Sequence, residues 1–424
     1  MSVWQLTLVL ALLIPCGVCQ FLNSLSLAPS DTSTGDKSWT KEAIRRLWVE
    51  RKKMGHTPLF RYKYPAQPNV EILFKNESAS MTGSLKHRYA WMLMMWALME
   101  GHVTQGRTVY EASSGNTAAS LGYMCRLIGS NFTVIVPETI EAVKQQHIEE
   151  FGTTVVKVPI SQRLERAREE AETNNGFFMN QFGNADKAED YHETGDYQLE
   201  SLNMFHEILS QMHDDPAQIV KVPHYFIHTA GTGGTISSIG RYIKKYGLNT
   251  KVVFADTQYS VYYDVVVNER FTNESGAHLW ISPGMAGFGY GPMGPAQKGK
   301  TSSLDPAVID RALKVPDLAS TAAMKVLRDQ GIEGGTSSGI NFISALHVAA
   351  TNKGNRTVTI TTILSDPAYY YDATYYNRDW ISKNFKVHGG LRVYDCWVRV
   401  IQQALEEPID PLAVGNEMCQ MAIH

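Results

Sequence analysis

Apolar and polar residues alternate along this chain in runs of two lengths. Short apolar runs rich in β-branched residues and bounded by turn residues predict strands, and longer runs between them predict helices. The predicted strands are residues 70–74, 109–111, 132–137, 154–158, 225–228, 251–255 and 358–364. The predicted helices are residues 39–53, 85–101, 117–128, 141–151, 162–173, 237–245 and 341–350.

Strands that are separated by helices of this length predict parallel sheets with helices on both faces. The chain has 424 residues, which is more than one hydrophobic core usually supports. We therefore expect an α/β protein of two lobes, with mainly parallel sheets covered by helices.

The N-terminus differs from the rest of the chain. Residues 6–15 are almost wholly apolar and lead into Cys16-Gly17-Val18-Cys19, a small-residue pattern that a signal peptidase cleaves. The pattern predicts a secretory signal peptide over residues 1–19; an uncleaved membrane anchor is the alternative, but the run is short for a span. Asn-x-Ser/Thr sequons at Asn76, Asn131, Asn273 and Asn355 fit the same pathway. We expect a secreted or lumenal glycoprotein without a stable membrane span after cleavage.

Cleavage near Cys19 leaves three cysteines, too few for a disulfide framework. Cys396 and Cys419 could pair in an oxidising lumen. Cys125 falls in an apparent core helix, where we expect a reduced apolar filler.

The charges exclude several kinds of partner. The 39 basic and 42 acidic residues nearly cancel, and no basic run is interleaved with aromatic residues, so neither nucleic acid nor an anionic membrane is expected. No spacing of His, Cys, Asp and Glu predicts a metal site. Small-molecule chemistry is the remaining expectation.

Four loops have the composition of binding loops. In α/β sheets, ligands bind at the carboxyl ends of strands. The candidates in that context are residues 80–88, which contain Lys86, and residues 111–117 and 229–235; residues 334–339, before an apolar helix, are a fourth candidate. Lys86 alone is either a solvated side chain or a buried, reactive amine. Residues 334–339 could equally serve as a helix cap.

Residues 231–235 have the properties of a phosphate-binding loop. Three glycines permit close approach, successive N–H groups can donate, and a helix follows. Tight turns also collect glycine. The loop lacks the lysine of a P-loop and the spacing of a dinucleotide-binding motif, so we expect it to hold a single phosphate monoester.

Several short motifs together carry a specific resemblance. From about residue 45 to residue 385, their order and spacing resemble the cysteine synthase/cystathionine β-synthase family of fold-type II pyridoxal-phosphate enzymes. The motifs are Gly-His-Thr-Pro-Leu (55–59), Ser-Leu-Lys-His-Arg (84–88), Ser-Ser-Gly-Asn-Thr (113–117), Gln181-Phe182, Gly-Thr-Gly-Gly-Thr (231–235) and Gly-Thr-Ser-Ser-Gly (335–339).

The resemblance implies pyridoxal 5'-phosphate as the cofactor, in a Schiff base with Lys86. It implies that Asn116 binds the ring 3'-oxygen and that Ser337 faces the pyridine nitrogen. The implied phosphate ligands are Gly231, Thr232, Gly233, Gly234 and Thr235. The implied ligands of a substrate carboxylate are Ser113, Ser114, Gly115, Thr117 and Gln181.

The implied activity is β-elimination or β-replacement on a small β-substituted amino acid, namely serine, O-acetylserine or cysteine. Lys86, once released from the cofactor, would act as the base at Cα, and a thiol would be the second reactant. A serine opposite the ring nitrogen makes the cofactor a milder electron sink, which suits this chemistry. Dimerisation is usual in the family, so a homodimer is expected.

The resemblance also implies a domain organisation. We expect an N-terminal extension over residues 20–44 and a catalytic core over residues 45–385, with a small lobe (about 88–195) inserted in a large lobe. Residues 386–424 form a tail without a counterpart in the family.

The chain departs from the family pattern at several positions. Ser80-Met81 stands where the family has Asn-Pro, His87 stands where it has Asp, and residues 282–288 match loosely. The alternatives are therefore a catalytically weak or inactive secreted pseudoenzyme and a serine/threonine dehydratase-like lyase. The Ser-Phe-Lys motif and tetraglycine loop of the dehydratases are absent.

Two further features have no family role. We expect His87 to be a solvated or hydrogen-bonded helix residue rather than a catalytic group. The tyrosines at 369–371 and 375–376 could shape a pocket, but a subunit contact is the favoured interpretation.

Overall fold

The structure is a computed structural model of the chain that describes residues 34–189, 201–269, 283–291, 296–352 and 356–420. The predicted signal peptide, most of the predicted extension, and the sequons at Asn273 and Asn355 lie outside the described residues.

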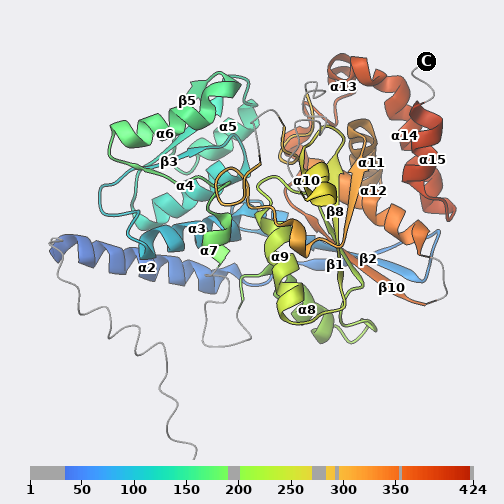
Figure 1. The fold of residues 1–424 in the computed structure, drawn as a ribbon, viewed down its shortest axis with the longest axis horizontal. Coiled ribbons are helices and arrows are strands. Elements are labelled where there is room, and N and C mark those ends of the chain that lie inside the picture. Colours follow the sequence, from blue (N-terminus) through green and yellow to red (C-terminus); the bar gives the residue numbers. More distant parts are fainter. Residues whose placement is uncertain (1–33, 190–200, 270–282, 292–295, 353–355, 421–424) are drawn as a thin grey trace, which may run out of the picture.

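The protein has two lobes, each built around a sheet (Figure 1). The sheet of the small lobe has the order β5-β4-β3-β6, with all pairs parallel. The sheet of the large lobe has the order β1-β2-β10-β7-β8-β9, and only β1 is antiparallel to its neighbour. The strands are β1 (Leu59–Lys63), β2 (Val70–Asn76), β3 (Val109–Ala112), β4 (Phe132–Pro137), β5 (Thr154–Val158), β6 (Phe177–Phe178), β7 (Tyr225–His228), β8 (Lys251–Thr257), β9 (Arg311–Val315) and β10 (Val358–Leu364).

Helices cover both sheets. They are α2 (Thr34–Met54), α3 (Lys86–Met99), α4 (Asn116–Ile128), α5 (Ala142–Glu149), α6 (Arg163–Thr173), α7 (Ala185–Glu189), α8 (Met204–Asp214), α9 (Gly234–Lys245), α10 (Tyr262–Asn268), α11 (Asp317–Asp329), α12 (Thr336–Thr351), α13 (Arg378–Asn384), α14 (Gly390–Glu406) and α15 (Pro411–Gln420). Among the described residues, no helix is long and apolar enough to cross a membrane.

The small lobe is organised by α3, which is apolar on nearly all sides and is buried from His87 to Leu98. A helix of that composition belongs inside a core, because it has no polar face to present to water. It packs against α4 and also against α2, where Trp91 Nε1 donates a 2.7 Å hydrogen bond to Leu47 O. The expected border between extension and core, at residues 44 and 45, falls inside α2.

The large lobe is organised by β10, which lies between β2 and β7 and is buried along its whole length. Its run of Val, Ile and Thr is typical of a central parallel strand with helices on both faces. α11 and α12 pack against each other, and α14 packs on α11.

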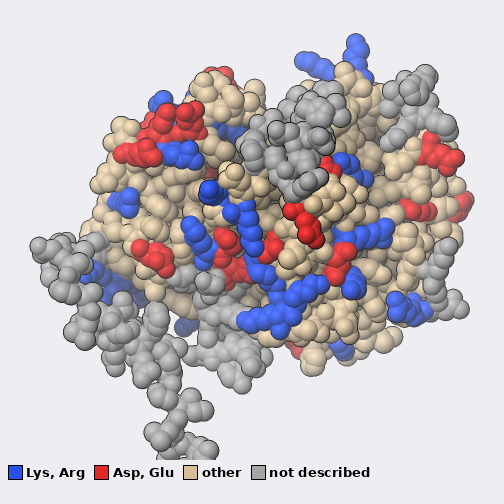
Figure 2. All heavy atoms as spheres, in the orientation of Figure 1, with Lys and Arg blue, Asp and Glu red and all other residues tan. Residues whose placement is uncertain are grey.

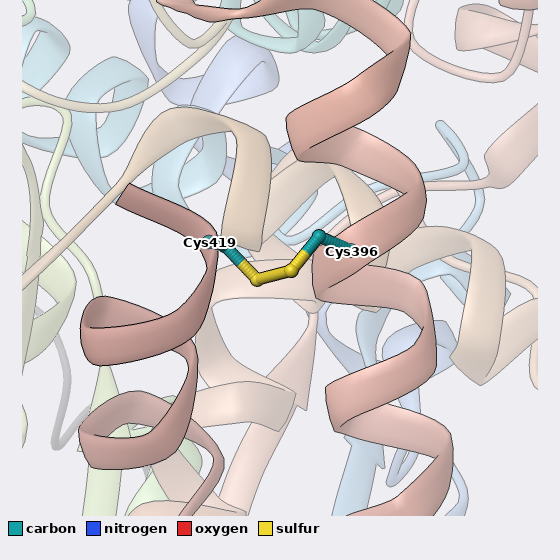
Figure 3. Close-up of a disulfide and its surroundings, with 2 residues drawn as sticks. All are labelled: Cys396 and Cys419. Carbon is teal, nitrogen blue, oxygen red and sulfur yellow. A yellow bond between two sulfur atoms is a disulfide. The ribbon is translucent and has the colours of Figure 1, made fainter. Parts of the chain in front are cut away.

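The tail from residue 386 onward completes the core of the large lobe. α15 packs on both α12 and α14. Cys396 in α14 and Cys419 in α15 form a disulfide, the pairing that the sequence left open (Figure 3). Cys125 is a free, buried cysteine, as expected.

The predicted α/β class is confirmed by this architecture. The strands at 132–137, 154–158, 225–228 and 358–364 match the prediction to the residue. β9, α8, α11 and α13 were not predicted.

The charged side chains on the face that contains α9 are mixed in sign (Figure 2). Arg241 on α9 pairs with Glu189 and with Asp305, and Lys298 also pairs with Asp305 at 2.6 Å. Lys244 pairs with Asp310 at 3.1 Å. The basic side chains here therefore have acidic neighbours.

Candidate active site

Lys86 is the first residue of α3 and follows a tight polar loop. The Ser80 hydroxyl accepts a 3.0 Å hydrogen bond from Ser84 N and donates one of 2.6 Å to Ser84 O. Leu85 N donates to Ser365 O at 2.8 Å, which fixes the loop against the segment that follows β10. The loop thereby holds the half-buried Lys86 at the carboxyl end of the large sheet.

The environment of Lys86 favours the neutral amine. Burial lowers the pKa of Lys86 to about 8, although the nearby Asp366 carboxylate raises it in part. A neutral amine can act as a nucleophile or base, whereas the ammonium ion cannot. Lys86 therefore reaches its reactive form at a much lower pH than an exposed lysine does.

Asp366 joins three of the loops around Lys86. Its Oδ2 accepts hydrogen bonds from Asn116 Nδ2 at 2.8 Å and from Tyr371 OH at 2.7 Å. Its carbonyl accepts from Gly335 N at 3.0 Å. Burial raises the pKa of this carboxyl group, and the two side-chain donors oppose that rise. Asp366 thus holds Asn116 of the small lobe and the 335–339 loop in register with the lysine.

One cleft brings most of the predicted cofactor residues together. Lys86, Asn116, Gly231, Thr232, Gly233, Thr235 and Ser337 all line it. The other lining residues include His228, Phe288, Ser365, Asp366 and Tyr371. Four segments that are far apart in the sequence therefore face one space.

The glycine-rich loop connects β7 to α9. Gly233 has φ +87°, and a Cβ there would lie 2.3 Å from Leu304 N, so only glycine fits. The first N–H groups of α9 have no partner within the helix and are suited to bind an anion. Gly234 does not line the cleft, and its N–H donates to Thr232 Oγ1 at 3.2 Å.

Two buried hydroxyl groups in the cleft wall could also bind a ligand. Thr229 Oγ1 and Ser365 Oγ are buried without a hydrogen bond to any part of the chain that the structure describes. Buried polar groups of this kind are normally satisfied by a ligand or water. Together with the loop N–H groups, they make the cleft suitable for a ligand that bears a phosphate.

The predicted carboxylate ligands lie beside this cleft and do not line it. Ser113, Ser114, Gly115 and Thr117 occupy the β3–α4 junction that ends at Asn116.

Gln181 is fixed against the same strand by Glu111. The Glu111 carboxyl accepts from Gln181 N at 3.0 Å and from Ala112 N at 2.8 Å. Burial raises the pKa of Glu111 to about 7. That Gln181 and the four residues of the β3–α4 junction bind a substrate carboxylate stays a prediction.

The tyrosine cluster contacts the cleft loops, which supports the pocket-shaping alternative, while the subunit contact stays a prediction. Tyr371 lines the cleft. Tyr375 OH donates to Gly284 O at 2.9 Å and accepts from Ala286 N at 3.0 Å, and Tyr376 OH donates to Gly334 O at 2.6 Å. Phenol groups can bridge loops in this way because one end packs in the core while the other hydrogen-bonds.

His87 and His228 differ in whether they line the cleft. His87 is buried, with Nε2 3.3 Å from Glu50 Oε1 on α2, and it does not line the cleft. His228 does line the cleft, and its Nδ1 accepts a 3.1 Å hydrogen bond from Asn341 Nδ2. Burial, with the charge of Lys86, lowers the pKa of His228 to about 3, so this imidazole is neutral at physiological pH.

Sequence reasoning missed Asp366, Tyr371 and His228 as site residues. The signal for Asp366 was present, because it directly follows a buried strand whose carboxyl end faces the other loops. No group of three or more His, Cys, Asp and Glu side chains that could hold a metal occurs among the described residues.

Comparisons with known proteins agree on one family. The family model described as "Pyridoxal-phosphate dependent enzyme" matches residues 51–363. A pyridoxal-phosphate dependent protein of Caenorhabditis elegans is 45% identical over 405 residues, 93% of either chain.

An L-cysteine desulfhydrase of Mycobacterium tuberculosis is 32% identical, covering 86% of this chain and 93% of that protein. The solved structure of a hydrogen sulfide-producing enzyme from Fusobacterium nucleatum aligns with a TM-score of 0.62 at 23% identity, covering 76% of this chain and 98% of that chain. This likeness shows the fold.

Proposed function

This chain belongs to the pyridoxal-phosphate dependent enzyme family, and from that premise we propose that it catalyses β-elimination and β-replacement on a small β-substituted L-amino acid. Cysteine is the first candidate substrate, with serine and O-acetylserine next. The proposal depends above all on one observation: Lys86 shares a cleft with Asn116, the glycine-rich loop and Ser337.

The residues present fit the cofactor, which is pyridoxal 5'-phosphate. Lys86 would hold its aldehyde carbon, Asn116 its ring oxygen, and the loop at 231–235 its phosphate. Ser337 offers a hydroxyl rather than a carboxylate at the start of α12. When bound, the cofactor supplies an electron sink for the electron pair that Cα keeps when it loses its proton.

The chain supplies the proton transfer. Lys86 is the amine that can take the Cα proton, because burial keeps much of it neutral near pH 8. Asp366 places Asn116 beside it, and the neutral His228 adds no second positive charge. Tyr375 and Tyr376 hold two of the loops that surround the cleft.

The choice of cysteine is supported by the relative that is named an L-cysteine desulfhydrase. In the corresponding reaction, cysteine and water would give sulfide, pyruvate and ammonia. If a thiol replaces the sulfide at the β-carbon, the product is a thioether amino acid instead.

The test is a substrate panel with the purified, cofactor-loaded protein. Cysteine, serine and O-acetylserine are supplied separately, with and without a thiol, and sulfide, pyruvate and thioether products are measured. We expect turnover of at least one of them. A protein that carries covalent cofactor and turns over none of them would contradict the proposal and favour the pseudoenzyme.

We also propose that the protein works in the secretory pathway. The Cys396–Cys419 disulfide supports this, because such bonds persist in oxidising compartments. The exposed Asn131 is available for glycosylation, whereas the Asn76 side chain accepts hydrogen bonds from Ser78 N and Oγ. Glycopeptide mapping of protein from the culture medium should find glycan on Asn131; retention of an unmodified, reduced chain in the cytosol would contradict the proposal.

A further inference from the structure

A second, larger cavity adjoins the cleft. It has a volume of about 510 Å³ and lies between the start of α6 in the small lobe and the loops after β8 in the large lobe. Phe288 lines both this cavity and the cleft that holds Lys86. A group attached to a reacting molecule in the cleft could therefore extend past Phe288 into the second cavity.

Most of the cavity wall is apolar or already satisfied. Ile160, Leu164, Met285, Phe288 and Tyr290 supply apolar surface.

The polar groups of the large lobe in this wall are held by their own neighbours. The Ser260 hydroxyl accepts from Tyr262 N at 3.2 Å and from Tyr290 N at 3.0 Å. The Thr257 hydroxyl donates to the Asp317 carboxyl. These groups are therefore not available to bind a charged ligand.

Arg163 is the exception. Its Nε donates a 3.2 Å hydrogen bond to Ile160 O, and no side-chain carboxylate pairs with its guanidinium among the described residues. Burial lowers its pKa, and no acidic group in the described part of the chain opposes that shift. By contrast, Arg166 on the same helix pairs with Glu170 at 2.7 Å. A half-buried guanidinium without an anion, set in an apolar wall, matches a ligand with a short hydrocarbon stem and a carboxylate at its end.

We propose that this cavity binds the β-substituent of the reacting amino acid, as it enters or leaves, and that Arg163 binds a carboxylate on that substituent. The inference rests on the proposed function, and it names the substrate class: thiols, or β-substituents, that carry a carboxylate. The same cavity would hold the leaving group and the incoming thiol, because the bond to the β-carbon breaks and forms at one position.

The binding test uses two unreactive probes of matched size, 3-(methylthio)propionate and 3-(methylthio)propan-1-ol, titrated into the cofactor-loaded protein by calorimetry. The acid should bind about tenfold more tightly than the alcohol, as expected for a charge-assisted hydrogen bond. Arg163→Gln should abolish the difference, Arg163→Lys should keep part of it, and Arg166→Gln should leave it unchanged. Equal binding in the natural protein, a preference that survives Arg163→Gln, or no binding of either probe would overturn the inference.

A turnover measurement separates this inference from the function on which it rests. With 3-mercaptopropionate and 3-mercaptopropan-1-ol as second reactants, Arg163→Gln should raise KM about tenfold for the acid alone. Arg166→Gln, which breaks the pair with Glu170 on the same helix, should leave both KM values and the release of sulfide or pyruvate from cysteine unchanged. A protein that binds the acid selectively but turns over no amino acid would fail the proposed function and leave the Arg163 site standing.

Discussion

Two basic residues in the first turn of α3, Arg88 and Lys86, lie in surroundings that differ in charge. Arg88 lies in a closed ion network: it donates to Glu207 Oε1 at 2.7 Å and to Glu77 Oε2 at 2.8 Å. Lys75 completes the network at 2.9 Å from Glu207 Oε2. Lys86, close by in the same helix, faces a cleft and pairs with no carboxylate within ion-pair distance in the part of the chain that the structure describes.

The difference in surroundings explains why Arg88 has a structural role and Lys86 a chemical one. Burial alone would raise the pKa of Glu207, but Arg88 and Lys75 hold it well below its usual range, so the network stays charged. At Lys86 the Asp366 carboxylate offsets burial only in part, and the pKa falls to about 8. Paired cations therefore keep the Glu207 carboxylate ionised in the interior, whereas burial with one partly compensating carboxylate lowers the pKa of Lys86.

Removal of Lys86 should give the largest effect on activity. Lys86→Ala is expected to lower turnover by at least about 10³-fold, since both the attachment point and the base are lost. The free energy of unfolding should change by less than about 1 kcal/mol, because no ion pair is broken. Steady-state kinetics and urea unfolding measure the two effects. Lys52→Ala, on exposed α2, is the control, and a Lys86→Ala enzyme with near-normal turnover would refute the assignment.

Disruption of the network should give the reverse pattern. Arg88→Met removes the guanidinium that pairs with the buried Glu77 and Glu207 carboxylates, which should lower the free energy of unfolding by about 3–5 kcal/mol. Arg166→Met, which breaks the exposed pair with Glu170, should cost less than about 1 kcal/mol. Urea unfolding measures the free energy of unfolding of both variants. Equal decreases would show that the buried network contributes no more to stability than an exposed ion pair does.

The pH dependence of cofactor attachment should report the lowered pKa of Lys86. Only the neutral amine attacks an aldehyde, and its fraction rises with pH up to the pKa and then levels off. With a pKa of about 8, the attachment rate of cofactor-free protein should rise about tenfold from pH 7 to pH 9 and then level off. Stopped-flow absorbance measures it. A rate that still rises beyond pH 10 would mean an ordinary exposed lysine.

The smallest expected effect tests the influence of the Asp366 carboxylate on the pKa of Lys86. Asp366 stabilises the ammonium form of Lys86, so Asp366→Asn should shift the midpoint of that pH profile downward, by up to about one pH unit. Asp372→Asn, which removes an exposed partner of Arg328, is the matched control. An unchanged or higher midpoint in Asp366→Asn would contradict the electrostatic account.

The sequence predicted the elements whose pattern is local. β4, β5 and β10 are apolar runs bounded by turn residues, and their ends match the structure. The loop at 231–235 was found because glycine and hydroxyl residues at a strand end carry a direct chemical meaning, and the segment at 335–339 because such residues stand before an apolar helix.

The missed features depend on contacts between distant residues. Asp366 gains its role only because β10 lies centrally in the sheet and places it against Asn116, 250 positions earlier. Tyr375 and Tyr376 looked like a surface cluster, and only the folded chain shows which loops their hydroxyls reach. The Arg163 cavity forms between two lobes, so no local pattern predicts it.

The most direct test of the central claim is to identify the residue that holds the cofactor. The purified protein is loaded with pyridoxal 5'-phosphate, reduced with borohydride, digested and mapped by mass spectrometry. We predict that the phosphopyridoxyl group is found on Lys86 and is absent from Lys75. Attachment to another lysine, or none to Lys86 when the cofactor is bound, would contradict the account.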